Sequence, residues 1–160
     1  MAPDIAASAR VSASSIGASE IREFVTVRDS RIGDGCKIYE RTSIKKCDIG
    51  DAVDVNAGSY LENATLEPNV QVAPNSNVVG VTHDLGDQGM EFRNDSFEEI
   101  VLREGAFLGA GTVVGPGVEI GANAVVAAGA TVTEDVDPEM IVLGSPPTQR
   151  VVELEDWLDR

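Results

Sequence analysis

Aromatic side chains are scarce in this 160-residue chain, which limits the kind of core that it can build. They make up 4% of the residues, whereas 42% are apolar and 16 residues are glycine. A core of bulky rings is excluded, but short aliphatic side chains are numerous enough to pack in layers. The length is that of about one domain. The composition therefore favours a repetitive β architecture over a disordered chain.

Positive charge is also in short supply. Lysine and arginine together number 12, against 27 aspartates and glutamates, so the formal net charge is −15. Nucleic acids and anionic membrane surfaces repel such a chain, and the sequence contains no basic stripe, so neither is an expected partner. An acidic, lysine-poor surface is typical of halophilic proteins, because concentrated salt screens the repulsion between like charges.

Histidine and cysteine are too few for a metal site or a disulfide framework. His83 is the single histidine, and Cys36 and Cys47 belong to no C-x-x-C motif. We expect both cysteines to be reduced thiols that act as small core residues. A three-histidine zinc site cannot be built, which excludes a γ-class carbonic anhydrase, and no metal is expected to be required.

Several other motifs are missing as well. The chain has no G-x-S-x-G elbow, no G-x-G-x-x-G and no Walker lysine loop, which argues against hydrolases, dinucleotide enzymes and phosphate-cradle enzymes. No apolar run is long enough to span a bilayer, and residues 1–4 do not begin a signal peptide. We therefore predict a cytoplasmic protein.

What the sequence does have is an aliphatic residue at every sixth position of its second half. The series is Leu102, Leu108, Val114, Ile120, Val126 and Val132. Four residues after each comes a small or β-branched residue, namely Ala106, Thr112, Val118, Ala124, Ala130 and Val136. A spacing of six places successive side chains on opposite faces of an α-helix, so the repeat argues against helices.

A six-residue unit fits one short strand and a turn, and three such units close a triangular coil. Gly109, Gly115 and Gly121 directly follow repeat residues, and we expect them at corners that need a positive φ. The same phase runs more loosely from Val11 to Val78, and the nineteen inward positions make about six coils. The prediction is an all-β parallel β-helix, which can bury its flat faces as a homotrimer.

Two segments interrupt the repeat. Residues 80–100 are polar and aperiodic, which predicts a loop extruded from a β-helix domain that spans 1–138. Residues 139–160 form a C-terminal extension. The spacing of its apolar residues after Thr148, a possible N-cap, predicts a short helix.

The motif around the histidine resembles that of a known group. Residues 72–75 read Val-Ala-Pro-Asn, His83 follows eight residues later, and the loop contains Glu91-Phe92-Arg93. This pattern resembles the left-handed β-helix, or hexapeptide-repeat, acyltransferases, and within them the galactoside, maltose, colanic-acid and xenobiotic O-acetyltransferase-like branch. Residues 128–133 and 144–147 are also similar to this family. The resemblance implies a left-handed coil and acetyl transfer from acetyl-coenzyme A to a small, sugar-like acceptor.

The resemblance also implies site residues. His83 is the catalytic base, since a neutral imidazole suits proton abstraction near pH 7. The substrate-binding candidates are Asn56, Glu62, Asp84 and Arg93. The coenzyme-binding candidates are Phe107, Ala110, Gly111, Ala128, Gly129, Thr133 and Arg150. Each has a plainer reading, as a solvated loop residue, a structural corner glycine or one more apolar edge residue.

Two positions depart from the family pattern. Glu134 and Thr148 stand where the family commonly has basic residues that resemble contacts to coenzyme phosphates. The expected function is acetyl transfer to a hydroxyl, or alternatively an amine, of a sugar or sugar nucleotide. A trimeric β-helix that serves as a scaffold or binds glycans without catalysis is the alternative that these departures favour.

Overall fold

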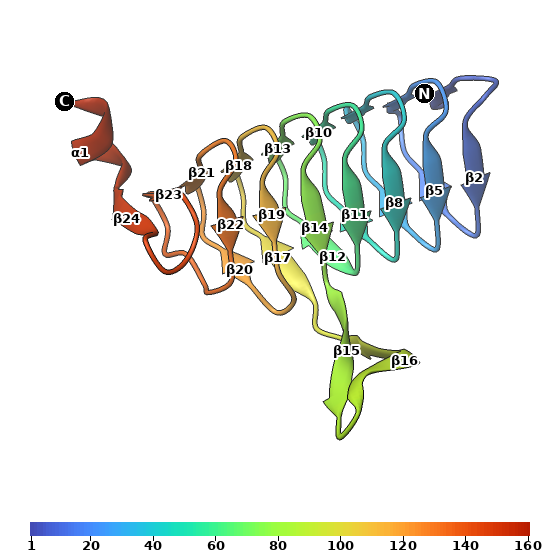
Figure 1. Ribbon diagram of the computed structural model, residues 1–160. Coiled ribbons are helices and arrows are strands. Elements are labelled where there is room, and N and C mark those ends of the chain that lie inside the picture. The colour runs from blue at the N-terminus through green and yellow to red at the C-terminus, as the bar shows by residue number, and fades with distance from the viewer.

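The computed structural model describes residues 1–160 and shows a chain wound into a coil with a parallel sheet along each of three sides (Figure 1). Sheet A contains β1 (Asp4–Ile5), β4 (Glu20–Ile21), β7 (Lys37–Ile38), β10 (Asp54–Val55), β13 (Gln71–Val72), β18 (Phe107–Leu108), β21 (Val125–Val126), β23 (Met140–Leu143) and β24 (Arg150–Glu153). All of these strands are parallel except β24, which is antiparallel to β23.

The other two sides are shorter. Sheet B contains β2 (Arg10–Ser12), β5 (Thr26–Arg28), β8 (Ser43–Lys45), β11 (Tyr60–Glu62), β14 (Asn77–Val79), β19 (Val113–Val114) and β22 (Thr131–Val132). Sheet C contains β3 (Ser15–Ile16), β6 (Arg31–Ile32), β9 (Asp48–Ile49), β12 (Ala64–Leu66), β17 (Ile100–Leu102) and β20 (Glu119–Ile120). The all-β parallel β-helix predicted from the repeat is confirmed, but it has about 8 turns rather than about six. The first and last parallel strands of sheet A, β1 and β23, lie outside the run that the repeat identified.

The core is the column of aliphatic side chains that the repeat predicted. From Leu102 to Val132 every repeat residue is fully buried, and the small residues between them, such as Ala106 and Thr112, are buried too. Thirty buried residues form one continuous cluster along the coil axis. Burial of aliphatic surface at about 25 cal/mol per Å² is the main stabilising term for such a column.

The looser spacing of the first half has a simple geometric cause. One turn advances by 17 residues from Val55 to Val72, but by 18 residues from Leu108 to Val126. In the first half, the inward residues on either side of the corner between sheets B and C are five positions apart, as Leu61 and Leu66 are, and the corner contains one residue with a positive φ, as at Asn63 (φ 52°). The missing residue of each turn is therefore lost at this corner.

The reason given for the repeat glycines was wrong, because none of Gly109, Gly115 and Gly121 has a positive φ. At Gly121 a Cβ would collide with the backbone of Pro138 and lie 2.6 Å from the carbonyl carbon of Asp137. Close approach of the next coil therefore requires this glycine. The positive φ angles occur two residues further on, as at Gly111 (φ 68°) and Asn123 (φ 56°).

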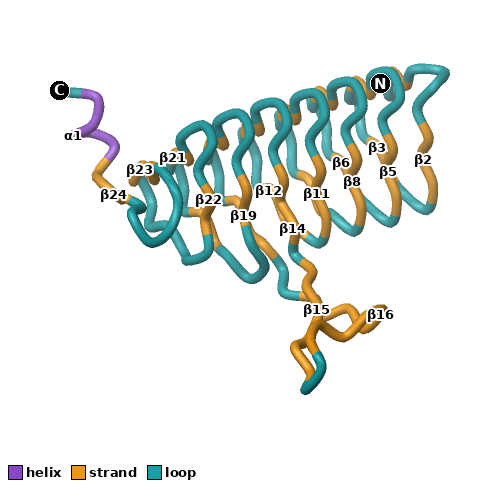
Figure 2. Tube along the Cα trace, in the orientation of Figure 1, coloured by secondary structure: helices purple, strands orange, loops and turns teal.

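Residues 80–100, expected to be a loop, form a β-hairpin that leaves the prism at the B–C corner (Figures 1 and 2). Its strands are β15 (Val81–Gly86) and β16 (Gly89–Phe97), which pair in antiparallel fashion with a bulge between His83 and Leu85. The hairpin exposes the large apolar side chains of Leu85, Met90 and Phe92. The polar composition of the segment concealed its strands.

The C-terminus carries the predicted short helix, α1 (Leu154–Leu158). Thr148 is not its N-cap, because Arg150–Glu153 first form β24 and Glu153 occupies the cap position without a capping side-chain bond. The pairing of β24 with β23 covers the edge of the last coil, and β24 is itself the edge strand of sheet A. Sheet A continues through β23, and the division of the chain at residue 138 stays a prediction.

Candidate functional site

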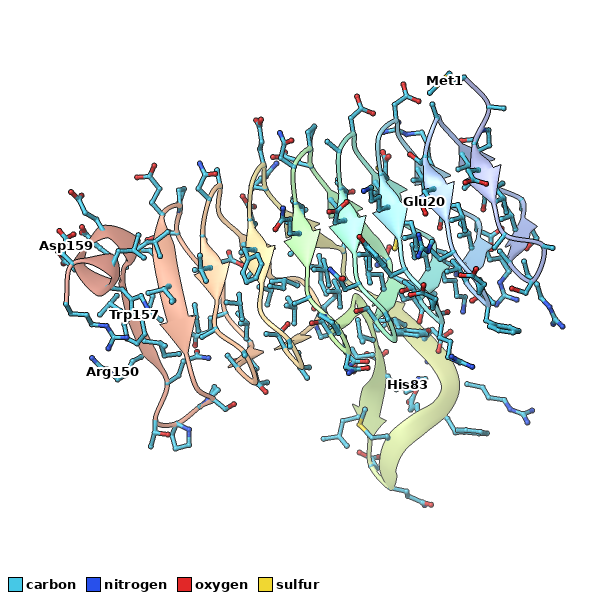
Figure 3. All side chains as sticks on the ribbon, turned by 90° about the horizontal axis from the view of Figure 1, so that it is seen from above. Met1, Glu20, His83, Arg150, Trp157 and Asp159 are labelled. Carbon is cyan, nitrogen blue, oxygen red and sulfur yellow. The ribbon has the colours of Figure 1, made fainter.

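His83 lies on β15 with its ring partly exposed, beside the facing strand of the hairpin (Figure 3). Its Nδ1 is 3.2 Å from the carbonyl oxygen of Asn94 and 3.5 Å from Oδ1 of Asp95. A carbonyl oxygen can only accept, so this hydrogen bond requires a proton on Nδ1. In the neutral ring Nε2 then keeps its lone pair, which is the form that a general base needs.

The two other hairpin candidates do not orient the histidine. Asp84 forms no hydrogen bond or ion pair, so the carbonyl of Asn94 fixes the tautomer instead. Arg93 has a positive φ of 67°, and its guanidinium carbon lies 5.2 Å from the centroid of the Phe92 ring. Both residues remain available to a ligand that approaches the hairpin.

Glu62 is buried at the base of the hairpin, where its backbone carbonyl accepts a hydrogen bond from the Gly80 amide at 2.8 Å. Its carboxylate accepts hydrogen bonds from the Tyr60 hydroxyl at 2.6 Å and pairs with Lys45 Nζ at 3.0 Å. Burial alone raises the pKa of the Glu62 carboxyl, but the bonds from Tyr60 and Lys45 outweigh it and lower the pKa. Burial and this same bond raise the pKa of Tyr60 to about 12.

The Glu62 carboxylate is expected to make stability depend on pH. Because its pKa is below the usual 4.5 in the folded chain, the unfolded chain binds more protons. The stabilisation of the folded chain by this carboxylate is complete above the pKa of the unfolded chain, and it is lost as the pH falls through the pKa of the folded chain. Denaturant unfolding at a series of pH values should show this loss, and Glu62→Gln should flatten it.

The matched control for this prediction is Glu139→Gln, which neutralises an exposed carboxylate that forms no ion pair. It should keep the wild-type dependence on pH. A Glu62→Gln protein whose unfolding follows the wild-type pH profile would show that the carboxylate contributes nothing to it.

Most coenzyme candidates lie on a different edge of the prism, between sheets A and B. Ala110 and Gly111 follow β18, Ala128 and Gly129 follow β21 one coil later, and the Gly129 amide donates to the Ala110 carbonyl at 2.8 Å. A Cβ on either glycine would meet nothing within 4 Å. This edge therefore leaves open space for a narrow ligand.

The remaining candidates are dispersed. Phe107 is exposed on β18 in sheet A, and Asn56 lies on the A–B edge, with its side-chain amide donating to the Val72 carbonyl at 3.2 Å. Thr133 follows β22 in sheet B, and Arg150 lies at the C-terminal end, away from His83 (Figure 3). Glu62 thus lies at the base of the hairpin that carries His83, and the coenzyme candidates lie on other parts of the coil.

His83 lines none of the five main grooves of the chain. These grooves are lined by residues of the last coil and α1, of the corner between sheets C and A, and of the first coils. One of these, of about 570 Å³, lies between Pro138, Met140 and Leu154. His83 lies on the β15–β16 hairpin, which projects from the coil.

Neither a metal centre nor a membrane-spanning helix is present. No three histidine, cysteine, aspartate or glutamate side chains are arranged to hold a metal ion. Cys36 and Cys47 are buried free thiols, as predicted, and burial raises the pKa of Cys47 to about 12. None of the helices has the length and apolar character needed to cross a bilayer.

The sequence analysis missed the partners of His83 and Glu62. Asn94 and Asp95 face the histidine because the chain reverses at Gly86-Asp87-Gln88-Gly89. Two glycines that flank two polar residues are a hairpin signal. Counting back from this turn pairs His83 with Phe92, however, because the bulge that shifts its partner to Asp95 leaves no signal in the sequence. Lys45 follows from the register of β8 and β11, which only the coil length reveals, whereas Tyr60 lies two residues before Glu62 on β11 and so shares its face of the strand.

Comparison with known proteins supports the repeat directly. The family model described as "Bacterial transferase hexapeptide (six repeats)" matches residues 99–134. A curated relative, the bifunctional protein GlmU of Pelobacter propionicus, is 44% identical over 45 residues. That match covers 28% of this chain and 10% of GlmU, so the chain spans a small part of that relative.

Solved structures share the fold over most of the chain. AntD, an N-acyltransferase from Bacillus cereus in complex with dTDP and coenzyme A, has a TM-score of 0.75 at 18% identity, with 88% of this chain and 82% of that one covered. A hexapeptide-repeat acetyltransferase from Vibrio cholerae has a TM-score of 0.67 at 23% identity, with 88% and 73% covered. At such identities the likeness establishes the fold.

Proposed function

We propose that this chain, which has the hexapeptide-repeat fold of the left-handed β-helix acyltransferases, transfers an acetyl group from acetyl-coenzyme A to a hydroxyl of a sugar or sugar nucleotide. The observation that carries the proposal is the Nδ1 contact of His83 with the Asn94 carbonyl, which leaves Nε2 free to accept a proton. An amine is the second class of acceptor, because AntD is an N-acyltransferase.

The chemistry follows from this tautomer. As the acceptor oxygen attacks the thioester carbonyl, its proton moves to Nε2 of His83, and the imidazolium that forms lies 3.5 Å from the Asp95 carboxylate. The carbonyl oxygen develops negative charge, which backbone amides at an open corner can stabilise. The proton then passes to the departing thiolate, and the base returns to its neutral form. No enzyme nucleophile is needed.

The separation of His83 from the A–B edge supports assembly as a homotrimer. An exposed hairpin with apolar side chains such as Leu85 and Phe92 is unfavourable in a lone chain. In a closed trimer, the hairpin of one subunit reaches toward the coils of the next. The acceptor and the coenzyme then meet between subunits, and sedimentation analysis tests the trimer.

The direct test is acetyl-coenzyme A binding by calorimetry, in low and in molar salt, followed by turnover with a panel of sugars and sugar nucleotides. Saturable binding and acceptor-dependent release of free thiol are the expected results. Absence of binding at both salt concentrations would reject the enzyme and leave the noncatalytic scaffold or glycan-binding function, which Glu134 and Thr148 favour.

Restoring one basic residue is expected to strengthen coenzyme binding. Glu134 is exposed just after β22, and Glu134→Lys changes a repulsive charge near the coenzyme phosphates into an attractive one. An exposed ion pair contributes modestly, so we expect about a fivefold lower Kd for coenzyme A in low salt and little change in molar salt. Glu155→Lys on α1 is the control of equal charge. Equal effects of the two variants would mean that position 134 does not face the coenzyme.

A further inference from the structure

A groove of about 330 Å³ runs across the first three strands of sheet B, β2, β5 and β8. It is lined by Arg10, Ser12, Thr26, Val27, Arg28, Ser43, Ile44 and Lys45. These residues come from three successive turns. In one row across the strands Arg10 pairs with Thr26 and Thr26 with Ser43, and in the other Ser12 pairs with Arg28 and Arg28 with Lys45. The sequence showed no basic stripe because the members are about one turn apart along the chain.

The charge of this groove is opposite to that of the protein. It collects three of the 12 basic residues of a chain with 27 acidic ones, and no carboxylate lines it. The grooves nearby on the first coils are lined by Asp48, together with Asp51 or Asp29. The groove is therefore locally positive, although the molecule as a whole has a net charge of −15.

Two of the cations have no partner within the protein. Arg10 and Arg28 are exposed and form no side-chain hydrogen bond or ion pair, whereas Lys45 is held by the buried carboxylate of Glu62 at 3.0 Å. Hydroxyl groups lie between them, and Thr26 Oγ1 donates to Ser43 Oγ at 3.1 Å, which leaves the Ser43 proton free. Guanidinium groups beside hydroxyl donors are the set that binds phosphate oxygens.

We propose that this groove binds the phosphate groups of a nucleotide. Neighbouring strands are about 4.8 Å apart, so donors from three turns can contact one pyrophosphate. The groove also lies on the hairpin side of the molecule, since Lys46, which follows Lys45, places its Nζ 4.2 Å from the ring centroid of Phe97 on β16. The inference rests on the proposed function only for its two candidate ligands, a nucleoside diphosphate acceptor and coenzyme A.

The experiment measures binding of inorganic pyrophosphate, thymidine diphosphate and coenzyme A by calorimetry in low salt, without any second substrate. The test variant is Arg10→Gln with Arg28→Gln, and the control is Lys37→Gln with Arg160→Gln, which removes the same charge outside the groove. Loss of charge-assisted bonds is expected to weaken pyrophosphate binding about tenfold for each arginine. Thr26→Glu, which adds a carboxylate to the groove, is expected to abolish it.

Weaker thymidine diphosphate binding with unchanged coenzyme A binding assigns the groove to the acceptor, and the reverse assigns it to the donor. If wild type binds no pyrophosphate, or if the test and control variants bind all three ligands equally well, the proposal is overturned. The measurement does not depend on acetyl transfer. A groove that binds pyrophosphate in a protein without turnover would therefore contradict the proposed function and leave the groove intact.

Discussion

Replacement of His83 by alanine is expected to lower turnover by about 10²-fold to 10⁴-fold, the usual contribution of a positioned general base. The ring is on a projecting hairpin outside the core, so the coil should keep its fold. The measurement is kcat at saturating acetyl-coenzyme A and acceptor, together with circular dichroism. Binding of acetyl-coenzyme A should change little, because its candidates lie on the A–B edge.

A matched variant separates catalysis from damage to the hairpin. Asp87→Asn changes a polar side chain at the hairpin turn, where it contacts neither His83 nor its partners, and should retain wild-type turnover. Asp95→Asn keeps the shape of the residue beside Nδ1 but removes its charge, and should lower kcat by about tenfold with little change in KM. If His83→Ala turns over like wild type, then another group is the base.

Gly121→Ala is expected to destabilise the coil strongly. The new Cβ would collide with the backbone of the next turn at Asp137 and Pro138, which cannot move without disturbing the last coils. Overpacking against backbone in a dense interior costs roughly 2–4 kcal/mol of unfolding free energy. Denaturant unfolding measures this loss, provided that the slope of the transition is unchanged.

The same repeat position one unit earlier provides the control. Gly115 also follows a buried repeat residue, but a Cβ there would meet only the Val132 carbonyl oxygen at 3.4 Å, an ordinary contact. Gly115→Ala should therefore change stability by less than about 1 kcal/mol. Equal losses in the two variants would mean that the glycines act through backbone flexibility and that steric contact is not the cause.

The repeat could be predicted from the sequence because its pattern is local and periodic. An aliphatic residue every six positions fixes which side chains point inward, and every one from Leu102 to Val132 is buried. The number of turns was predicted less well. The first turn at β1 contributes Ile5, which is still 39% exposed, so the N-terminal end of the column lacks the uniform burial that defines the middle.

The candidate site was less predictable because it depends on which edge each corner occupies. The hydrogen bond between the Gly80 amide and the Glu62 carbonyl places Glu62 at the base of the hairpin that carries His83, which is a consequence of stacking and not of spacing. Ala110 and Gly129 are neighbours for the same reason. A pattern of six identifies corners as a class, but it does not distinguish the three edges of the prism.

The corner that carries the hairpin has a simple counterpart one turn earlier. There Asn63 alone links sheet B to sheet C. In the next turn Gly80 and Ile100 lie on either side of the hairpin, and their backbone amides donate to the carbonyls of Glu62 and Asn63 in the turn before. The prism therefore closes in the same way with or without the insertion. The hairpin that carries His83 is therefore an insertion whose length and sequence can change while the coil that supports it stays unchanged.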